Sequence, residues 1–145
     1  MAYAYFDTSA LIKRYVQEAG RREVVQLLRR NHCVVSAVLP VEVRGALRRR
    51  VAERTLDDKR IAAVLKRFTG DRAFWTFVEV SREVLASAET LSGTHPIRAL
   101  DAIHVASAQL FATRIGPSAF TFVSADIRQT TVAAALGMNA TLIQT

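Results

Sequence analysis

Short strand-like runs that alternate with helical segments constrain the fold of this chain more than any other feature. Five runs rich in apolar, aromatic and β-branched residues are predicted strands: the run ending at Phe6, then 33–36, 74–80, 120–123 and 140–143. The segments between them show helical periodicity: 9–17, 21–30, 36–53, a helix capped by Asp57, 81–91, 97–114 and 126–136. This alternation predicts a parallel α/β sandwich. The 145 residues contain no repeat or linker, which favours a single domain over 1–145.

Two of the predicted helices follow each other without a strand between them. They occupy about 38–70, and we expect them to project from the sheet as a helical arm. Gly70-Asp71 is expected to end the second of them, and Ser92-Gly93-Thr94-His95-Pro96 is a predicted loop. The helix over 97–114 is apolar on nearly every side, which predicts that it is buried.

Charge and cysteine content narrow the classes of function. Lys and Arg number 20 against 13 Asp and Glu, so the formal net charge is +7, which favours polyanionic partners such as nucleic acid. The single cysteine, Cys33, lies in an apolar run and is predicted to be a buried, inert thiol. There is no basic leader and no apolar run near the ~20 residues of a membrane span, so we expect a cytoplasmic protein without membrane contact.

Four acidic residues lie in apolar contexts where carboxylates are unusual. Nine of the thirteen acids neighbour basic residues, turns or solvent-facing positions, and four do not: Asp7, Glu42, Asp101 and Asp126. An unpaired buried carboxylate costs several kcal/mol, so a protein normally protonates it, pairs it or binds it to a metal. Arg44 or Arg98 offers pairing for any one of them, but that explanation is less persuasive for all four together.

Topology brings two of these acids to the same edge of the sheet. Asp7 ends the first predicted strand and Asp126 follows the fourth, and such strands are neighbours in a doubly wound sheet. Converging carboxylates suit Mg²⁺ or Mn²⁺, whereas the separated histidines and lone cysteine offer no zinc site. A cation held this way activates water for phosphodiester hydrolysis, with Lys and Arg holding the nucleic-acid backbone. The alternative for Asp7 or Ser9 is simple capping of the next helix.

The order and context of the four acids resemble the PIN-domain ribonucleases, in particular the VapC-type toxins of toxin–antitoxin modules. The motifs are Tyr5-Phe6-Asp7-Thr8-Ser9-Ala10-Leu11-Ile12-Lys13, Glu42 in an early helix, Leu100-Asp101-Ala102-Ile103-His104-Val105-Ala106-Ser107-Ala108 and Phe122-Val123-Ser124-Ala125-Asp126. The resemblance implies a PIN-like three-layer α/β/α sandwich whose parallel sheet has the strand order 3-2-1-4-5.

The resemblance also implies metal-dependent endonucleolytic cleavage of RNA that leaves a 5′-phosphate and a 3′-hydroxyl. It assigns catalysis and binding of Mg²⁺ or Mn²⁺ to Asp7, Glu42, Asp101 and Asp126, the last either directly or through water. Ser9 and Ser124 match hydroxyl positions that orient the first and fourth acids, although capping explains them equally well. His104 is interpreted as a packing and hydrogen-bonding residue, and not as a catalytic one.

The implied partners are an RNA substrate, a second copy of the chain in a homodimer, and a small antitoxin that wraps the helical arm and plugs the acidic site. The segment 44–68 is the candidate docking region, and its run 48–50 of three arginines either contacts RNA or is a solvated helix face. Two alternatives remain. One is a non-catalytic RNA- or protein-binding PIN module. The other is an Asp-based phosphotransferase or receiver domain, which requires a lysine at a later strand end that this chain lacks.

Overall fold

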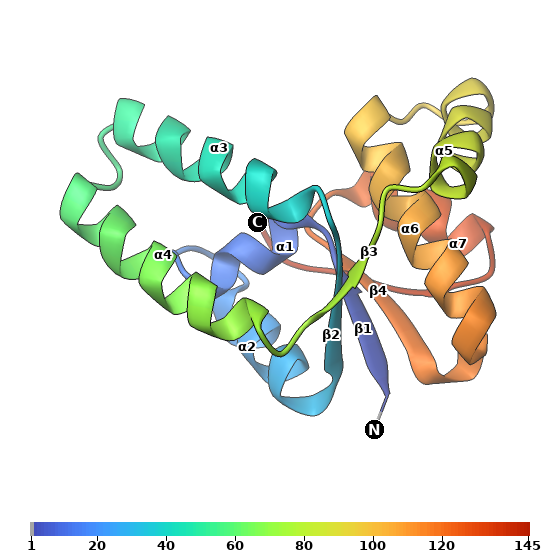
Figure 1. Cartoon of the computed structure of the whole chain (residues 1–145), viewed down its shortest axis with the longest axis horizontal. Coiled ribbons are helices and arrows are strands. Elements are labelled where there is room, and N and C mark those ends of the chain that lie inside the picture. Colours follow the sequence, from blue (N-terminus) through green and yellow to red (C-terminus); the bar gives the residue numbers. More distant parts are fainter. Residues whose placement is uncertain (1) are drawn as a thin grey trace.

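The computed structural model describes residues 2–145 and contains one five-stranded parallel sheet (Figure 1). The strands are β1 (Tyr3–Phe6), β2 (His32–Ser36), β3 (Thr76–Val78), β4 (Phe120–Ser124) and β5 (Asn139–Leu142). Their order in the sheet is β3-β2-β1-β4-β5, which confirms the predicted order 3-2-1-4-5. β1 is central: Tyr5 is in register with Val34 of β2 and with Phe122 of β4.

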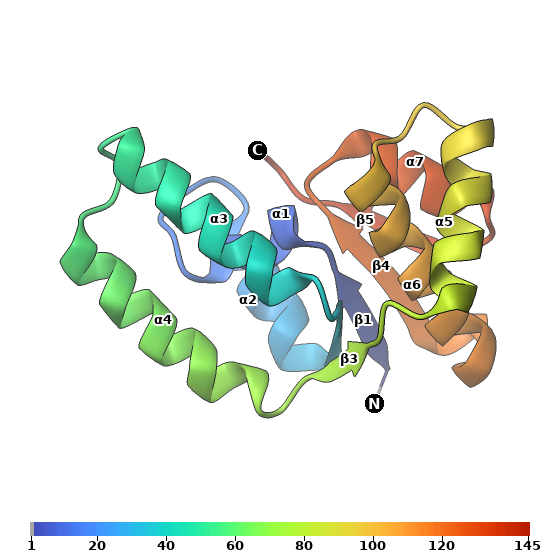
Figure 2. The same ribbon diagram turned by 45° about the horizontal axis from the view of Figure 1, so that its top comes forward.

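Helices cover both faces of the sheet and complete an α/β sandwich (Figures 1 and 2). They are α1 (Thr8–Leu11), α2 (Arg21–Arg30), α3 (Leu39–Ala52), α4 (Asp58–Arg72), α5 (Arg82–Thr94), α6 (Ala99–Ile115) and α7 (Ile127–Ala135), with 3-10 turns η1 (Ile12–Arg14) and η2 (Pro117–Ala119). α1 to α4 lie on one face and α5 to α7 on the other. None of the helices among the described residues has the length and apolar character needed to cross a bilayer.

Alternating residues of the strands supply two hydrophobic cores, one on each face. On β1, Ala4 and Phe6 pack toward α1–α4, whereas Tyr5 packs toward α5–α7. This alternation follows from the two-residue period of a strand, and burial on both faces explains why β1 is apolar throughout. Cys33 of β2 is buried as predicted, and burial raises the pKa of its thiol, which therefore stays protonated at neutral pH.

The helical arm formed by α3 and α4 is present, and its two helices extend away from the sheet on the same side (Figures 1 and 2). α3 buries four apolar side chains: Leu39, Val43, Ala46 and Leu47. α4 buries only Phe68. The predicted caps Asp57 and Ser81 are confirmed, since each side chain accepts a hydrogen bond from a backbone N–H in the first turn of its helix.

The predicted ends of α4 and of the next helix, α5, were both wrong. α4 continues through Gly70 and Asp71 to Arg72, and α5 continues to Thr94. Glycine inside a helix costs only about 1 kcal/mol, and the Asp71 carboxylate accepts hydrogen bonds from Arg14 Nε and Tyr15 Oη, which fix this end of α4. The predicted strand over 74–80 shrinks to β3 because the backbone N–H groups of Phe74 and Trp75 close turns onto the end of α4.

The loop before α2 packs tightly against the last residues of the chain. The helix predicted over 9–17 ends at Leu11 and gives way to η1, and Lys13 then donates a hydrogen bond to the Ala19 carbonyl. Gly20 has a φ of +88°, and a Cβ at this position would overlap Ile143 Cγ2 and the Gln144 carbonyl oxygen. This position therefore requires glycine for both its backbone conformation and its closeness to the chain end.

Candidate active site

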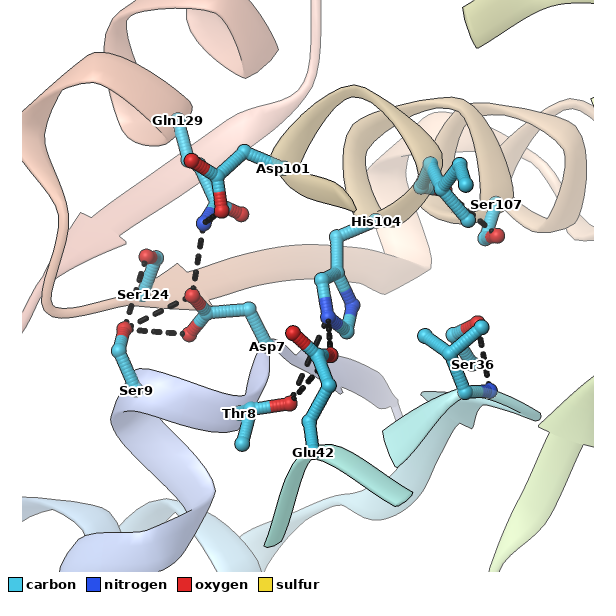
Figure 3. Close-up of polar contacts among 12 residues, drawn as sticks. Asp7, Thr8, Ser9, Ser36, Glu42, Asp101, His104, Ser107, Ser124 and Gln129 are labelled. Carbon is cyan, nitrogen blue, oxygen red and sulfur yellow. Dashed lines mark hydrogen bonds and ion pairs between the residues drawn. The ribbon is translucent and has the colours of Figure 1, made fainter. Parts of the chain in front are cut away.

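All four predicted acids line one cavity of about 870 Å³ at the carboxyl edge of the sheet. Asp7 and Asp126 follow the neighbouring strands β1 and β4, as the topology argument expected. Glu42 reaches the cavity from the first turn of α3 and Asp101 from the first turn of α6. Figure 3 shows Asp7, Glu42 and Asp101 approaching one another from these separate elements.

Asp7 is the most enclosed of the four acids, with a relative exposure of 1%. It caps α1 by accepting a hydrogen bond of 3.0 Å from Ala10 N, so capping and a place in the cavity belong to the same carboxylate. Ser9 Oγ lies 2.9 and 2.7 Å from its two oxygens, and Gln129 Nε2 donates at 2.9 Å. Burial raises the pKa of Asp7 despite these donors and the opposing effect of His104.

Asp101 is half-buried and is joined to Asp7 through one amide group. The nitrogen that donates to Asp7, Gln129 Nε2, also donates to Asp101 Oδ1 at 2.9 Å (Figure 3). Burial raises the pKa of Asp101, and the negative charges of Asp126 and Asp7 raise it further. Two carboxyl groups with raised pKa values that face one donor are the strongest electrostatic anomaly in the cavity.

Glu42 is held by a buried histidine in place of the arginine that the sequence offered. His104 Nε2 lies 2.6 Å from Glu42 Oε1, and Thr8 Oγ1 donates to the same oxygen at 2.8 Å. Burial raises the pKa of Glu42, but the His104 and Thr8 hydrogen bonds outweigh it and the net shift is downward. Glu42 is therefore ionised at neutral pH.

A hydrogen-bond chain behind Glu42 fixes the orientation of His104. The Tyr5 hydroxyl lies 2.8 Å from His104 Nδ1, and burial raises the pKa of this phenol well above its usual value. Since the Glu42 carboxylate only accepts hydrogen bonds, Nε2 carries a proton, and in the neutral ring Nδ1 accepts from Tyr5. His104 is thus the packing and hydrogen-bonding residue that the sequence predicted.

The two serines connect the loops that follow β1 and β4. Ser9 Oγ accepts a hydrogen bond of 3.1 Å from Ala125 N and lies 3.4 Å from Ser124 Oγ. Ser124 Oγ in turn accepts from Asp126 N at 3.0 Å. The helix caps in these loops are Asp7 and Asp126, not the serines. Ser9 therefore orients Asp7, and Ser124 orients the backbone that carries Asp126.

The donor set suits a cation that prefers oxygen ligands, although the side chains are not gathered around one point. Within residues 2–145, no three His, Cys, Asp or Glu side chains lie close enough together to hold a metal ion in their present positions. Asp7 and Asp101 each offer an oxygen 2.9 Å from the same nitrogen, so the centre of the cavity holds a pair of carboxylates of the kind that hard divalent cations bind.

Basic side chains form part of the cavity wall. Lys13 and Arg50 both pair with Glu18, at 3.2 Å each. Arg49 and Arg98 also line the cavity, and neither forms an ion pair within 4.0 Å among the residues that the structure describes. The cavity therefore combines acids at its centre with two cationic groups that are available to a polyanion.

Sequence reasoning missed Gln129 and the contact of Tyr5 with His104. Gln129 is neutral and therefore gives no charge signal in the sequence, although it is a polar residue on the buried stripe of α7 beside Val132 and Ala133. Its position three residues after Asp126 was the available signal, since residues three apart share a helix face. Thr8, which follows Asp7 in the first motif, donates its hydroxyl hydrogen bond to Glu42 and not to Asp7.

Fold and site together define an α/β domain with an acid-lined cavity at the carboxyl edge of a parallel sheet. The chain belongs to the PIN domain family, whose family model matches residues 4–136. No curated protein sequence gives a significant match to it.

Solved structures with the same fold include a toxin–antitoxin complex. A toxin–antitoxin complex from Klebsiella pneumoniae contains a chain 20% identical over 87% of this chain and 88% of that one, with a TM-score of 0.63. FitAcB from Neisseria gonorrhoeae gives 15% identity, coverage of 94% and 95%, and a TM-score of 0.66. VapBC2 from Rickettsia felis, bound to a DNA fragment from its promoter, gives 10% identity, coverage of 97% and 98%, and a TM-score of 0.65.

Proposed function

We propose that this protein is a Mg²⁺- or Mn²⁺-dependent endoribonuclease, and that it is the VapC-type toxin of a toxin–antitoxin pair. One observation carries the proposal: Asp7 and Asp101, whose pKa values are both raised, face a single hydrogen-bond donor in a cavity that Glu42 and Asp126 also line. Membership of the PIN domain family supports it, since PIN domains are generally nucleases and generally depend on divalent metals.

The side chains have distinct parts in this proposal. Asp7 and Asp101 would hold the cation, with Glu42 and Asp126 completing the acidic site. A divalent cation supplies an activated water nucleophile and stabilises negative charge on the phosphate oxygens. Ser9 keeps the Asp7 carboxylate oriented toward the cavity, and the Thr8–His104 pair does the same for Glu42. Because both Asp7 and Asp101 bind a cation as carboxylates, binding releases any proton that they carry.

The biological setting is proposed from the related structures. The similar structure from Klebsiella pneumoniae is a toxin–antitoxin complex, which supports a small antitoxin as the partner of this chain. The exposed side of the arm, within 44–68, is the proposed docking region. The proposal further includes a homodimer, a cytoplasmic location and an RNA substrate held by the cationic groups of the cavity.

Substitution of Asp7 or Asp101 by asparagine tests the proposed catalysis. Asparagine preserves the size of either side chain and the capping of α1, but it removes the charge that binds a cation. We expect Asp7→Asn and Asp101→Asn each to reduce metal-stimulated cleavage of total cellular RNA by roughly 100-fold or more. Asp58→Asn, an exposed position on α4, is the matched control and should cleave as the wild type does.

Two results would count against this function. One is undiminished cleavage by folded Asp7→Asn protein, which would show that the activity comes from elsewhere. The other is the absence of Mn²⁺ binding in a calorimetric titration of the wild type, which would favour the non-catalytic RNA- or protein-binding module. Circular dichroism spectra that match the wild type would establish that each variant is folded.

A further inference from the structure

Gln129 is a buried amide that faces the two central acids of the cavity. Its relative exposure is 2%, and it lies on α7, the helix that Asp126 caps. Its Nε2 donates to Asp7 Oδ2 and to Asp101 Oδ1, each at 2.9 Å (Figure 3). Because carboxylates only accept hydrogen bonds, the two acids fix which end of the amide faces them.

The other end of this amide is unsatisfied. Gln129 Oε1 is buried without a hydrogen-bond partner among the residues that the structure describes. A buried carbonyl oxygen without a donor is unfavourable, and an apolar side chain of the same size would avoid it. What such a side chain lacks is the pair of N–H groups, so the benefit of glutamine here lies in its contact with Asp7 and Asp101.

The position of Nε2 indicates what that contact does. Asp7 and Asp101 both lie within 2.9 Å of the same nitrogen, so their like charges are close enough to repel each other. The N–H groups are the positive end of the amide dipole, and they lie between the two carboxylates. A divalent cation bound by the same two oxygens would require this space and would repel the N–H groups.

We propose that Gln129 is a placeholder for the cation: its amide bridges Asp7 and Asp101 in the metal-free protein and is displaced from both when a divalent cation binds. This inference rests on the proposed function. Gln129 thereby stabilises the acidic site without a metal, and it weakens metal binding because the cation competes with two charge-assisted hydrogen bonds. It is a positioning residue that has no contact with the reacting phosphate.

Calorimetric titration of Gln129→Leu with Mn²⁺ tests the proposal. Leucine fills similar space without N–H groups, so binding no longer breaks the two hydrogen bonds. We expect the dissociation constant for Mn²⁺ to fall by about 10-fold or more. In EDTA the variant should unfold at a lower temperature than the wild type. Saturating Mn²⁺ should raise the unfolding temperature of the variant by more than it raises that of the wild type. Gln109→Leu is the matched control, because the Gln109 amide contacts Ser87 away from the cavity, and its affinity should equal that of the wild type.

The outcomes separate this inference from the proposed function. Unchanged or weaker Mn²⁺ binding by Gln129→Leu, with binding by the wild type intact, would overturn the placeholder and leave the function standing. Absence of Mn²⁺ binding by the wild type would overturn both.

A measurement on the unmodified protein covers the case in which Gln129→Leu does not fold. In nuclear magnetic resonance spectra of the wild type in EDTA, the Gln129 side-chain N–H signals should be shifted and slow to exchange with solvent. Saturating Mg²⁺ should abolish both properties. Signals that stay the same with saturating Mg²⁺ bound would overturn the placeholder.

Discussion

Asp7 serves the fold and the candidate site with one carboxylate. It caps α1 through Ala10 N, and it faces Asp101 across the Gln129 amide. The capping contact needs only an acceptor oxygen, whereas cation binding needs the negative charge. The two demands can therefore be separated by substitution, since asparagine satisfies the first and fails the second.

The pH dependence of stability should expose the cost of ionising Asp7. Because burial raises its pKa above the ordinary value of 3.8, the folded metal-free protein holds, at pH values between the ordinary and the raised pKa, a proton that the unfolded chain releases. Ionisation of Asp7 therefore lowers the free energy of unfolding as the pH rises from its ordinary pKa through its raised one. Ionisation of Asp101, whose pKa is also raised, likewise lowers the free energy of unfolding. Ionisation of Glu42, whose pKa is lowered, increases it.

We expect Asp7→Asn to gain stability relative to the wild type as the pH increases. Urea unfolding in EDTA at about pH 4 and about pH 7 measures the difference, which should grow by about 1.4 kcal/mol for each unit by which the pKa is raised. Thr69→Ala, an exposed substitution that changes no ionisable group, is the control and should show no such growth. A difference between Asp7→Asn and wild type that is equal at the two pH values would show that the folded and unfolded states do not differ in the titration of Asp7.

The four acids were predictable from sequence, whereas their neutral partners were not. A carboxylate in an apolar run conflicts with the cost of burying charge, so Asp7, Glu42, Asp101 and Asp126 were conspicuous. Tyr5 and His104 are separated by 99 positions, and nothing local in the sequence indicates that their side chains meet. Their pairing is set by how α6 packs on its face of the sheet, which only the folded structure defines.

At the scale of elements, α3 and α4 differ in how many side chains they bury: α3 buries four, whereas α4 buries one. α4 relies on Phe68, whose ring makes edge-to-face contacts with Tyr15 at a centroid distance of 5.8 Å and with Trp75 at 5.5 Å. The strong alternation of periods predicted the strands and most helices, whereas the strand order was implied by the resemblance to PIN domains. The sequence pattern misplaced the end of α4 because the Arg14 and Tyr15 contacts to Asp71 overrule the local preference of Gly70-Asp71 for a turn.

Truncation of Phe68 should loosen α4 selectively. Phe68→Ala removes the only buried side chain of this helix, and we expect the free energy of unfolding to fall by about 3–5 kcal/mol. Hydrogen exchange should show the amides of α4 losing protection before those of the sheet. The neighbouring exposed substitution Thr69→Ala should change stability by less than about 0.5 kcal/mol. Equal effects of the two substitutions would mean that α4 is held by other contacts.

At the scale of the whole molecule, a formal net charge of +7 surrounds an acidic centre. The positive field attracts a polyanion, and Arg49 and Arg98 at the cavity offer contacts to its phosphates. The acids, by contrast, repel phosphate unless a cation is present. If the protein has the proposed function, binding of the nucleic-acid backbone should be separable from cleavage, because the two would depend on different side chains.

The salt dependence of RNA binding should show whether Arg49 and Arg98 contact the RNA phosphates. In an Asp7→Asn background, which prevents cleavage, we expect the affinity for single-stranded RNA to fall with salt. Arg49→Gln and Arg98→Gln should each reduce the slope of log affinity against log salt by about 0.7. Fluorescence anisotropy provides the measurement, and Arg22→Gln, on the exposed side of α2, is the charge-matched control. A control that changes the slope as much as Arg49→Gln would indicate binding spread over the whole surface.

The contact of Gly20 with the last residues of the chain determines where a purification tag is best placed. Thr145 lines the acid cavity, and the preceding residues, Ile143 and Gln144, are pressed against Gly20. A purification tag fused after Thr145 would start at the cavity wall and would compete with RNA for the space in front of the acids. β1 begins at the amino ends of the strands and the cavity lies beyond their carboxyl ends, so a tag placed before β1 leaves the cavity open.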